Sequence, residues 1–345
     1  IQPRIDILAD HGTATQFSHL YAGDTAIDIY SRAASDVYQD LFGSGIYVGK
    51  GIYDIAAMHQ SLSGRIPDNS ILSHDLFEGL LARSALASNI VLYEDFPATY
   101  PENAMRMHRW IRGDWQLLPW LMRQVPTAAG EKVQSPLSHI DRWKIFDNLR
   151  RSLVPASLLL FFVAGWILLP GSAAIWTLLA VAAPGSYLVG EIHSLLSGGM
   201  RRGFVSDAIH WLADRGGRWF MAITFLVSDT IISLDAIART IWRLFFSKQK
   251  LLEWTAAAHK SASLRRQGIR AVAWRLMWPS SAFSVALGGY LATSDQQALL
   301  SAAPILLLWI FAPEIAVGTA QRRVLRRETL DETERRFLRR IARRT

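Results

Sequence analysis

Four apolar segments in the second half of the chain limit its fold more than any other feature. Each approaches the roughly 20 apolar residues that a helix needs to cross a bilayer. These segments are residues 153–169, 173–192, 271–293 and 299–319. The connectors 170–172 and 294–298 contain no Lys or Arg, whereas 193–270 contains twelve. By the positive-inside rule, the sequence predicts two membrane hairpins whose long flanking segments lie in the cytoplasm.

Charge is distributed unevenly along the chain. Residues 1–140 carry 10 Lys and Arg against 15 Asp and Glu, whereas residues 141–345 carry 27 against 14. This contrast predicts a cytoplasmic domain, 1–140, joined to a membrane region, 141–327. The tail, 328–345, is a charged helical segment without a cap and is expected to begin a linker to a further domain. Basic residues flank the apolar segments instead of forming a soluble stripe, which disfavours nucleic acid as a partner. The chain has no Cys, so disulfides and thiolate chemistry are excluded.

The stretch between the two hairpins, about 201–265, is predicted to form amphipathic helices at the membrane surface. Trp242 and its aromatic neighbours can enter the interface while nearby Arg and Lys side chains stay with the headgroups. A fifth span through 219–234 is the alternative, and Asp229 and Asp235 count against it.

Acidic and basic side chains concentrate in residues 71–116. Asp75 and Glu78 stand three apart at the start of a predicted helix, 75–87. This spacing fits a capping box, and it also fits a base, Asp75, that takes the proton from an attacking hydroxyl. Both interpretations can hold together. A strand follows and ends in the acidic pair of the motif YED.

A predicted helix over 102–123 is rich in Arg and Trp. Arg106, Arg109, Trp110 and Gly113 share one of its faces because they follow helical spacing. Guanidinium groups suit a diphosphate, an indole suits the C–H face of a sugar, and the glycine leaves room for a ligand. The alternative is an amphipathic helix that lies on lipid headgroups.

Lys50 lies between two glycines, Gly49 and Gly51, after a predicted short strand, and a helix is expected to begin near Asp54. The glycines would let the backbone pass close to a ligand, and the lysine could meet a phosphate or a sugar hydroxyl. A tight turn with a solvated lysine is the plainer interpretation.

Several motifs in the first 125 residues together resemble the cyclic β-1,2-glucan synthases of glycosyltransferase family 84. The motifs are QPR (2–4), SDVYQDLFG (35–43), GKGIYD (49–54), ILSHDLFEG (71–79) and HRWIRGDWQLLPWL (108–121). More distantly, HDxxE followed by YED and RxxRW resembles the glucosyltransferases that make periplasmic glucans and the processive family-2 synthases. The resemblance implies an α/β fold, the C-terminal, acceptor-side half of a GT-A domain, followed by an α-helical transmembrane region.

The same resemblance implies an inverting glucosyltransferase that builds β-1,2-glucan from UDP-glucose. It would be a multi-pass protein of the bacterial inner membrane, with its catalytic part in the cytoplasm. Asp75 would be the general base, while Arg109 would face the nucleotide diphosphate and Trp110 would stack under the acceptor glucose. Arg106 stands where the processive synthases carry Gln. The candidate substrate-binding residues are Arg109, Trp110, Arg106, Glu78, Lys50 and Asp114.

The resemblance also implies a divalent cation, Mg²⁺ or Mn²⁺, with ligands before Ile1 and none within this chain. The first residues read as the middle of a domain and the last as a segment that continues. The expected partners are therefore UDP-glucose, a growing β-1,2-glucan, the lipid bilayer, and N-terminal and phosphorylase-like C-terminal parts of the same polypeptide. The isolated chain is expected to be inactive. A processive synthase of another linear β-glucan and a non-catalytic export subunit are the alternatives.

Overall fold

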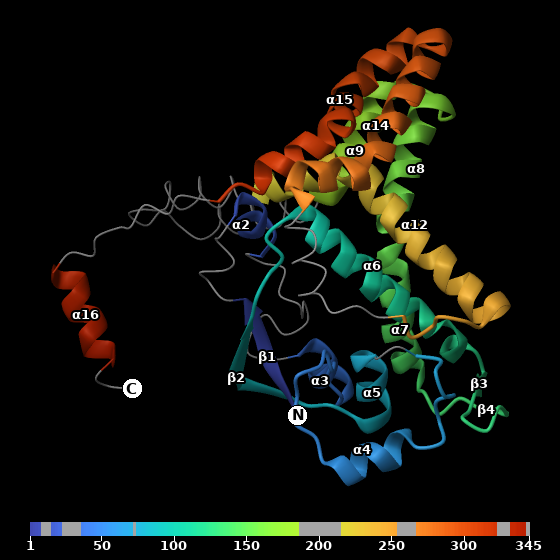
Figure 1. The fold of residues 1–345 in the computed structure, drawn as a ribbon, viewed down its shortest axis with the longest axis vertical. Helices are drawn as coiled ribbons and strands as arrows, with labels where there is room; N and C mark the ends of the chain where they lie inside the picture. Colours follow the sequence, from blue (N-terminus) through green and yellow to red (C-terminus); the bar gives the residue numbers. More distant parts are fainter. Residues whose placement is uncertain are drawn as a thin grey trace.

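The computed structural model describes residues 1–7, 15–22, 36–71, 74–185, 215–253, 267–322 and 332–342. Helices dominate the described chain, and strands are few (Figure 1). In the first part, the elements are β1 (Gln2–Ile7), α2 (Gln16–Ala22), α3 (Val37–Phe42), α4 (Ile55–Leu62), α5 (Asp75–Ala82), β2 (Leu86–Glu94), α6 (Tyr100–Gln116), a 3-10 helix (Leu118–Leu121), β3 (Gln124–Pro126) and β4 (Lys132–Gln134).

The remaining elements are mostly apolar helices. They are α7 (His139–Ser152), α8 (Val154–Ile167), α9 (Ala173–Ala182), a short 3-10 helix (Ala183–Gly185), α12 (Leu226–Trp242), a π-helical turn (Arg243–Ser247), α14 (Ile269–Ser294), α15 (Gln296–Thr319) and α16 (Glu332–Ala342). Helix α16 falls within the predicted linker, 328–345.

Strands β1 and β2 form a two-stranded parallel sheet, with Ile5 opposite Leu92 and Ile7 opposite Glu94. The only other sheet among the described residues is the antiparallel pair β3–β4. A parallel sheet in an α/β domain normally has several strands and is covered by helices on both faces. The two strands β1 and β2 alone do not form such a sheet. The predicted α/β GT-A half-domain is therefore not confirmed, although β2 forms where the sequence indicates a strand that ends in the motif YED.

The short strand expected at the start of IYVGK is wrong, because distant side chains take its backbone N–H groups. Asp36 Oδ2 accepts from Ile46 N at 2.9 Å, and Gln2 Oε1 accepts from Val48 N at 3.0 Å. Residues 44–48 consequently run as irregular backbone. The helix expected near Asp54 does form, and Asp54 Oδ1 caps α4 by accepting from Ala57 N at 2.8 Å.

Helix α5 begins one residue earlier than a capping box would require. Its N-cap is His74, without a side-chain cap, so Asp75 and Glu78 both lie in the first turn, where the helix dipole favours carboxylates. The capping-box interpretation is therefore wrong. Helix α6 ends at Gln116 instead of 123, because Pro119 lacks the N–H that would continue it.

Helices α5 and α7 and the 3-10 helix at 118–121 pack on one apolar core. Phe77, 1% exposed, meets Trp120 edge to face with ring centroids 4.9 Å apart. Gly79 lets α5 approach the preceding segment, since a Cβ there would lie 2.4 Å from Tyr47 Cβ. This contact fixes α5 against the segment that carries Lys50.

Replacing Gly79 by alanine is expected to destabilise the protein by about 1–3 kcal/mol, because the added methyl group must displace the Tyr47 backbone or side chain. Thermal unfolding of the detergent-solubilised protein measures the effect. Gly289→Ala in α14 is the matched control, since nothing lies within 4 Å of its Cβ position. The control is expected to leave stability unchanged or to raise it by up to about 1 kcal/mol. Equal unfolding temperatures for the two variants would contradict the close packing at Gly79.

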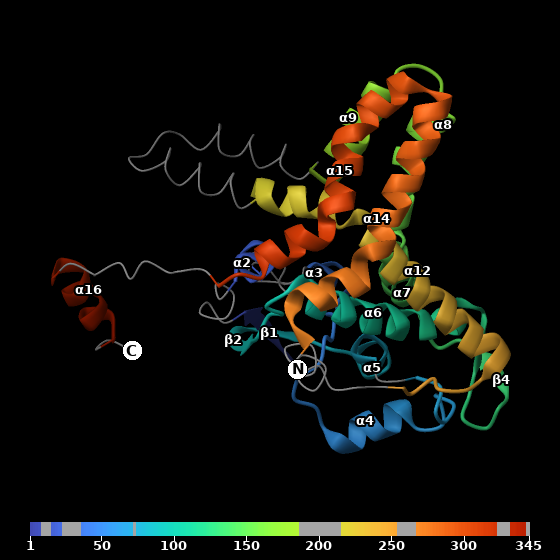
Figure 2. The ribbon, with the colours of Figure 1, turned by 45° about the horizontal axis from the view of Figure 1, so that its top comes forward.

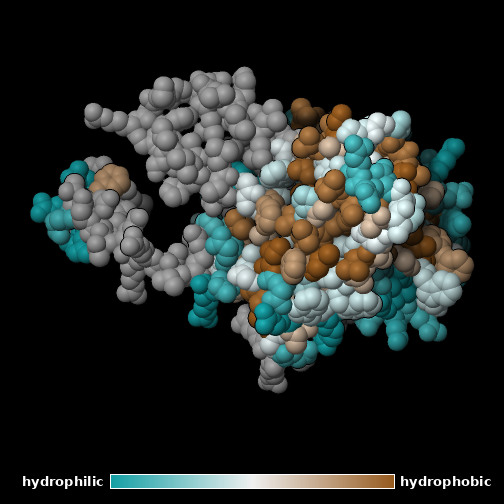
Figure 3. All heavy atoms as spheres, turned by 90° about the horizontal axis from the view of Figure 1, so that it is seen from above, coloured by the Kyte–Doolittle hydropathy of each residue, from teal (hydrophilic) through white to brown (hydrophobic). Residues whose placement is uncertain are grey.

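Helices α8, α9, α14 and α15 project together from the part that carries β1 and β2 (Figures 1 and 2). Trp309, fully buried, packs against Phe162 and Trp166 at the centre of this bundle. Large apolar side chains such as Leu160, Leu178 and Leu300 are exposed on its outside. Figure 3 looks onto this projection and shows hydrophobic side chains gathered over it. Such a surface is suited to a lipid environment.

Helix α15 is the one described helix that is long and apolar enough to cross a membrane by itself. Two bent pairs raise the number to three if each pair is one span: His139–Ser152 with Val154–Ile167, bent by 45°, and Arg215–Thr224 with Leu226–Ser247, bent by 62°. Helix α14 covers the predicted span 271–293, but its serines and glycines make it less apolar. The predicted span 173–192 is described only as far as 185. Four spans and a multi-pass topology therefore stay predictions.

Polar contacts tie α14 to α15. Pro313 lacks the N–H that would bond to the Trp309 carbonyl, and Ser280 Oγ donates to that oxygen at 3.2 Å instead. Glu314 accepts from Arg270 Nη2 at 2.6 Å and from Trp274 Nε1 at 2.7 Å. Glu314 thus pairs the two helices.

Helix α12 lies along α6, and one of its faces is buried there. Tyr100 Oη donates to Asp229 Oδ1 at 2.7 Å, whereas Trp242 and Phe246 are exposed. The predicted interfacial stretch is thus also packed against the part of the chain that precedes the membrane region. The rest of that stretch, 201–214 and 254–265, lies outside the described residues.

Candidate functional site

A cavity of about 1610 Å³ opens between α5, α6, α7, α12 and the end of β2. The candidate residues that line it are Lys50, Asp75, Arg106, Arg109, Trp110 and Asp114. Glu78 is not among the lining residues, so the structure does not bring its side chain into this site. Most of the candidate residues chosen from the sequence therefore line one cavity, although they come from three separate segments of the chain.

Asp75 enters the cavity from the first turn of α5. A Cβ on Gly49 would lie 2.8 Å from Asp75 Oδ2, and Gly49 has a φ of +85° that favours glycine. Gly49 therefore lets the backbone pass close to the Asp75 carboxylate. Burial raises the pKa of Asp75 above its ordinary value, while the charges of His74 and Lys50 oppose that rise. Asp75 is thus a stronger base than a solvated carboxylate.

Lys50 is not a freely solvated lysine. It forms an ion pair with Glu94, the last residue of β2. Burial lowers the pKa of Lys50, the Asp75 charge raises it, and the Arg106 charge lowers it. The lysine therefore sits among charges of both signs at the cavity wall.

Arg106 is sandwiched between two aromatic rings. Its Cζ lies 4.6 Å from the ring centroid of Phe96 and 4.7 Å from that of Trp110. Its Nη2 donates to Asn103 Oδ1 at 3.0 Å, while its Nε is buried without a partner. Arg106 therefore fixes one side of the Trp110 indole, whose residue is 38% exposed and lines the cavity.

The two guanidinium groups of this face have no carboxylate partner in the described part of the chain. Burial lowers the pKa of Arg106 to about 10, with the charge of Arg109 contributing. Burial also lowers the pKa of Arg109. Removing a charge from water without a counter-charge is costly, so a cavity wall of this kind suits an anionic ligand.

Asp114 is held by neighbouring side chains. Its Oδ1 accepts from Asn148 Nδ2 on α7 at 3.1 Å and lies 3.1 Å from His74 Nε2. The Cβ position of Gly113 lies 3.6 Å from His74 Cδ2, an ordinary van der Waals contact, and Gly113 lines the cavity. That this glycine leaves room for a ligand stays a prediction.

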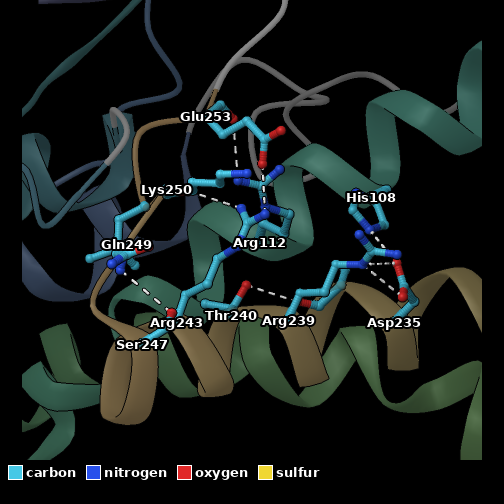
Figure 4. A network of polar contacts seen from close by, with 12 residues as sticks. His108, Arg112, Asp235, Arg239, Thr240, Arg243, Ser247, Gln249, Lys250 and Glu253 are labelled. Atoms are coloured by element: carbon cyan, nitrogen blue, oxygen red, sulfur yellow. Dashed lines mark hydrogen bonds and ion pairs between the residues drawn. The ribbon is translucent and has the colours of Figure 1, made fainter.

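The opposite face of α6 is bound to α12 and to residues 250–253 (Figure 4). His108 Nε2 lies 3.0 Å from Asp235 Oδ2, and Arg112 Nη2 donates to the Glu253 carbonyl at 3.2 Å. Arg243 pairs with the Glu253 carboxylate at 2.6 Å. With these contacts on one face and the cavity on the other, α6 is an internal helix, and the alternative of a helix lying on headgroups is wrong.

Nowhere in the described ranges do three or more His, Asp or Glu side chains come together as a group that could hold a metal ion. The residues at the cavity therefore do not fit the divalent cation implied by the motifs. That cation stays a prediction, with ligands expected outside this chain.

No protein-family model matches the chain. Over its whole length, however, the chain is 36% identical to the cyclic beta-(1,2)-glucan synthase NdvB of Rhizobium meliloti (strain 1021), in an alignment of 361 residues. The chain is a relative of one segment of a cyclic β-1,2-glucan synthase. It spans about 12% of the length of that relative. The resemblance first drawn from the motifs is thereby confirmed, and it supports a glucan synthase role.

The spacing arguments missed three side chains of the site: Glu94, His74 and Asn148. Glu94 pairs with Lys50, and the other two hold Asp114. The available signals were the motifs YED and HDxxE, which contain Glu94 and His74. Asn148 belongs to no motif, and only the packing of α7 against α6 brings it to the site.

Proposed function

We propose that this chain is the acceptor-side part of an inverting glucosyltransferase that builds β-1,2-glucan from UDP-glucose. One observation carries the proposal: a partly buried carboxylate, Asp75, lines the same cavity as the guanidiniums of Arg106 and Arg109, which have no carboxylate partner among the described residues, and the indole of Trp110. Together these groups supply a base, a site for an anionic leaving group and a platform for a sugar. The kinship to a glucan synthase supports this assignment.

In the proposed reaction, Asp75 takes the proton from the 2-hydroxyl group of the acceptor glucose. The acceptor oxygen forms a bond to the anomeric carbon of the donor, and the bond from that carbon to the diphosphate breaks on the opposite side. The configuration is inverted, the proton stays on Asp75, and UDP leaves. The raised pKa of Asp75 strengthens it as a base, and Arg109 with Arg106 stabilises the charge on the departing diphosphate.

Trp110 is proposed to stack against the acceptor glucose, since its ring combines a large apolar face with one side fixed by Arg106. Lys50 is proposed to contact a phosphate or a hydroxyl. Asp114 acts through His74 and Asn148, and Glu78 has no assigned contact. A divalent cation, where present, would share the diphosphate charge, and no step above depends on it.

We further propose that the chain is part of a multi-pass protein of the bacterial inner membrane, with the cavity on the cytoplasmic side. The exposed apolar side chains of the projecting helices support a place in the bilayer. The remaining parts of the polypeptide, including the donor-binding half and a phosphorylase-like region, are proposed to complete the enzyme. The isolated chain is then expected to show no transfer.

Linkage analysis of the product tests this function. The full-length protein, supplied with UDP-glucose in membranes, is expected to produce a glucan whose glucose units are joined through the 2-hydroxyl. Another linkage would favour a processive synthase of a different linear glucan. Synthesis that continues without a functional Asp75 would favour an export subunit and contradict the proposal.

A further inference from the structure

Three side chains, one from each of α5, α6 and α7, meet at the wall of the cavity that Asp75 lines. They are His74, the N-cap of α5, Asp114 of α6 and Asn148 of α7. The side chain of His74 is 10% exposed, and that of Asp114 is 21% exposed. Arg151 donates to the oxygen of the Asn148 amide, so the NH₂ group of Asn148 faces Asp114. The contact therefore has a defined orientation.

The orientation of the imidazole follows from its partner. A carboxylate accepts hydrogen bonds, so the His74 nitrogen that faces Asp114, Nε2, carries a hydrogen. The other nitrogen, Nδ1, is buried and has no partner among the described residues. A histidine held in this way is fixed in position.

We propose that His74 is a positioning residue for the transfer reaction: held by Asp114 and Asn148, it fixes the first turn of α5, and with it Asp75, at the cavity wall. This inference rests on the proposed function of Asp75. It also gives the carboxylate of Asp114 a role distinct from substrate binding.

The charges that face Asp75 determine what the loss of His74 does. They come from His74, from Lys50 in the preceding segment and from Glu78 on the same helix, and the Tyr47 hydroxyl lies nearby. Asp114 faces the far side of the imidazole. Burial raises the pKa of Asp75, while His74 and Lys50 lower it. Without His74 the pKa of Asp75 rises further, so the carboxylate becomes protonated at a higher pH.

The test is the pH dependence of glucosyl transfer by the full-length His74→Gln protein. Glutamine removes the charge and keeps an N–H group that can donate to Asp114. Because Asp75 acts in its ionised form, the acidic limb of the rate profile is expected to move to higher pH by about half a unit to one unit. A merely structural role would lower the rate equally at every pH and would leave that limb in place.

His108→Gln is the matched control, because His108 makes the same kind of contact with Asp235 but does not line the cavity. Its acidic limb is expected to stay where it is. Asp114→Asn provides a second variant, since it keeps an accepting oxygen and removes the carboxylate that holds the imidazole. Its acidic limb is expected to move in the same direction as that of His74→Gln.

An unshifted acidic limb in either of these two variants, when it inserts normally, overturns the inference. The proposed function is tested separately by Asp75→Asn. If Asp75→Asn is inactive while the limb does not move, only the role of His74 fails. If Asp75→Asn is active, the proposed function itself fails.

Discussion

Replacing Trp110 by alanine in the full-length protein is expected to raise the KM for the glucan acceptor by about tenfold to a hundredfold. The KM for UDP-glucose should change little. The indole is exposed to the cavity and has one side fixed by Arg106, so it presents a preformed face to a sugar ring. Losing a well-packed aromatic contact typically costs about 2 kcal/mol or more, which corresponds to this range. Initial rates at varied acceptor concentration measure the effect.

Trp143→Ala is the matched control for this prediction. Trp143 lies on α7, is similarly exposed and does not line the cavity. Its kinetics are expected to match those of the unmodified protein. Equal changes in both variants would point to a general loss of folding, and an unchanged acceptor KM in Trp110→Ala would remove Trp110 from the acceptor site.

Replacing Asp75 by asparagine is expected to lower kcat by about a hundredfold to ten-thousandfold, because an amide cannot take a proton from the acceptor hydroxyl. The two side chains have the same shape, so the contact with Gly49 should persist. Binding of UDP-glucose should also persist, since the groups proposed to face its diphosphate, Arg109 and Arg106, are unchanged. The expected result is thus an enzyme that binds its donor and fails at the chemical step.

Local sequence signals predicted the elements that carry the site. The face of α6 followed from helical spacing alone, because Arg106, Arg109 and Trp110 recur at intervals that place them together. Asp54 marked the start of α4 because its side chain can cap a helix. Pro119 also indicates that α6 ends before it, and the predicted end at residue 123 did not take this proline into account.

Local sequence signals could not predict contacts between distant segments of the chain. The backbone of 44–48 gives its N–H groups to the side chains of Asp36 and Gln2, which no local pattern indicates. Asp114 lines the cavity as predicted, but no local pattern indicated that His74 and Asn148 from two other helices hold it. Such pairings depend on how the helices pack, and spacing along one helix carries no information about them.

In the membrane region, too, the sequence predicted some features and not others. Apolar length marked residues 299–319, which match α15, because a spanning helix needs a long apolar run. Residues 153–169 contain a helix of only 14 residues, α8, which is bent by 45° relative to α7. The number of spans among the described helices is therefore one, or up to three if each bent pair of helices is counted as one span. Hydropathy does not report such a bend.

The rate of glucosyl transfer from UDP-glucose by the full-length Asp75→Asn protein in membranes tests the central claim most directly. Asp54→Asn is the matched control, since asparagine caps a helix about as well as aspartate and Asp54 lies outside the cavity. The account predicts at least about a hundredfold loss of rate for Asp75→Asn, with UDP-glucose still bound, and no loss for the control. Transfer by Asp75→Asn within about twofold of the unmodified protein, in a form that folds and inserts normally, would contradict the assignment of Asp75 as the catalytic base.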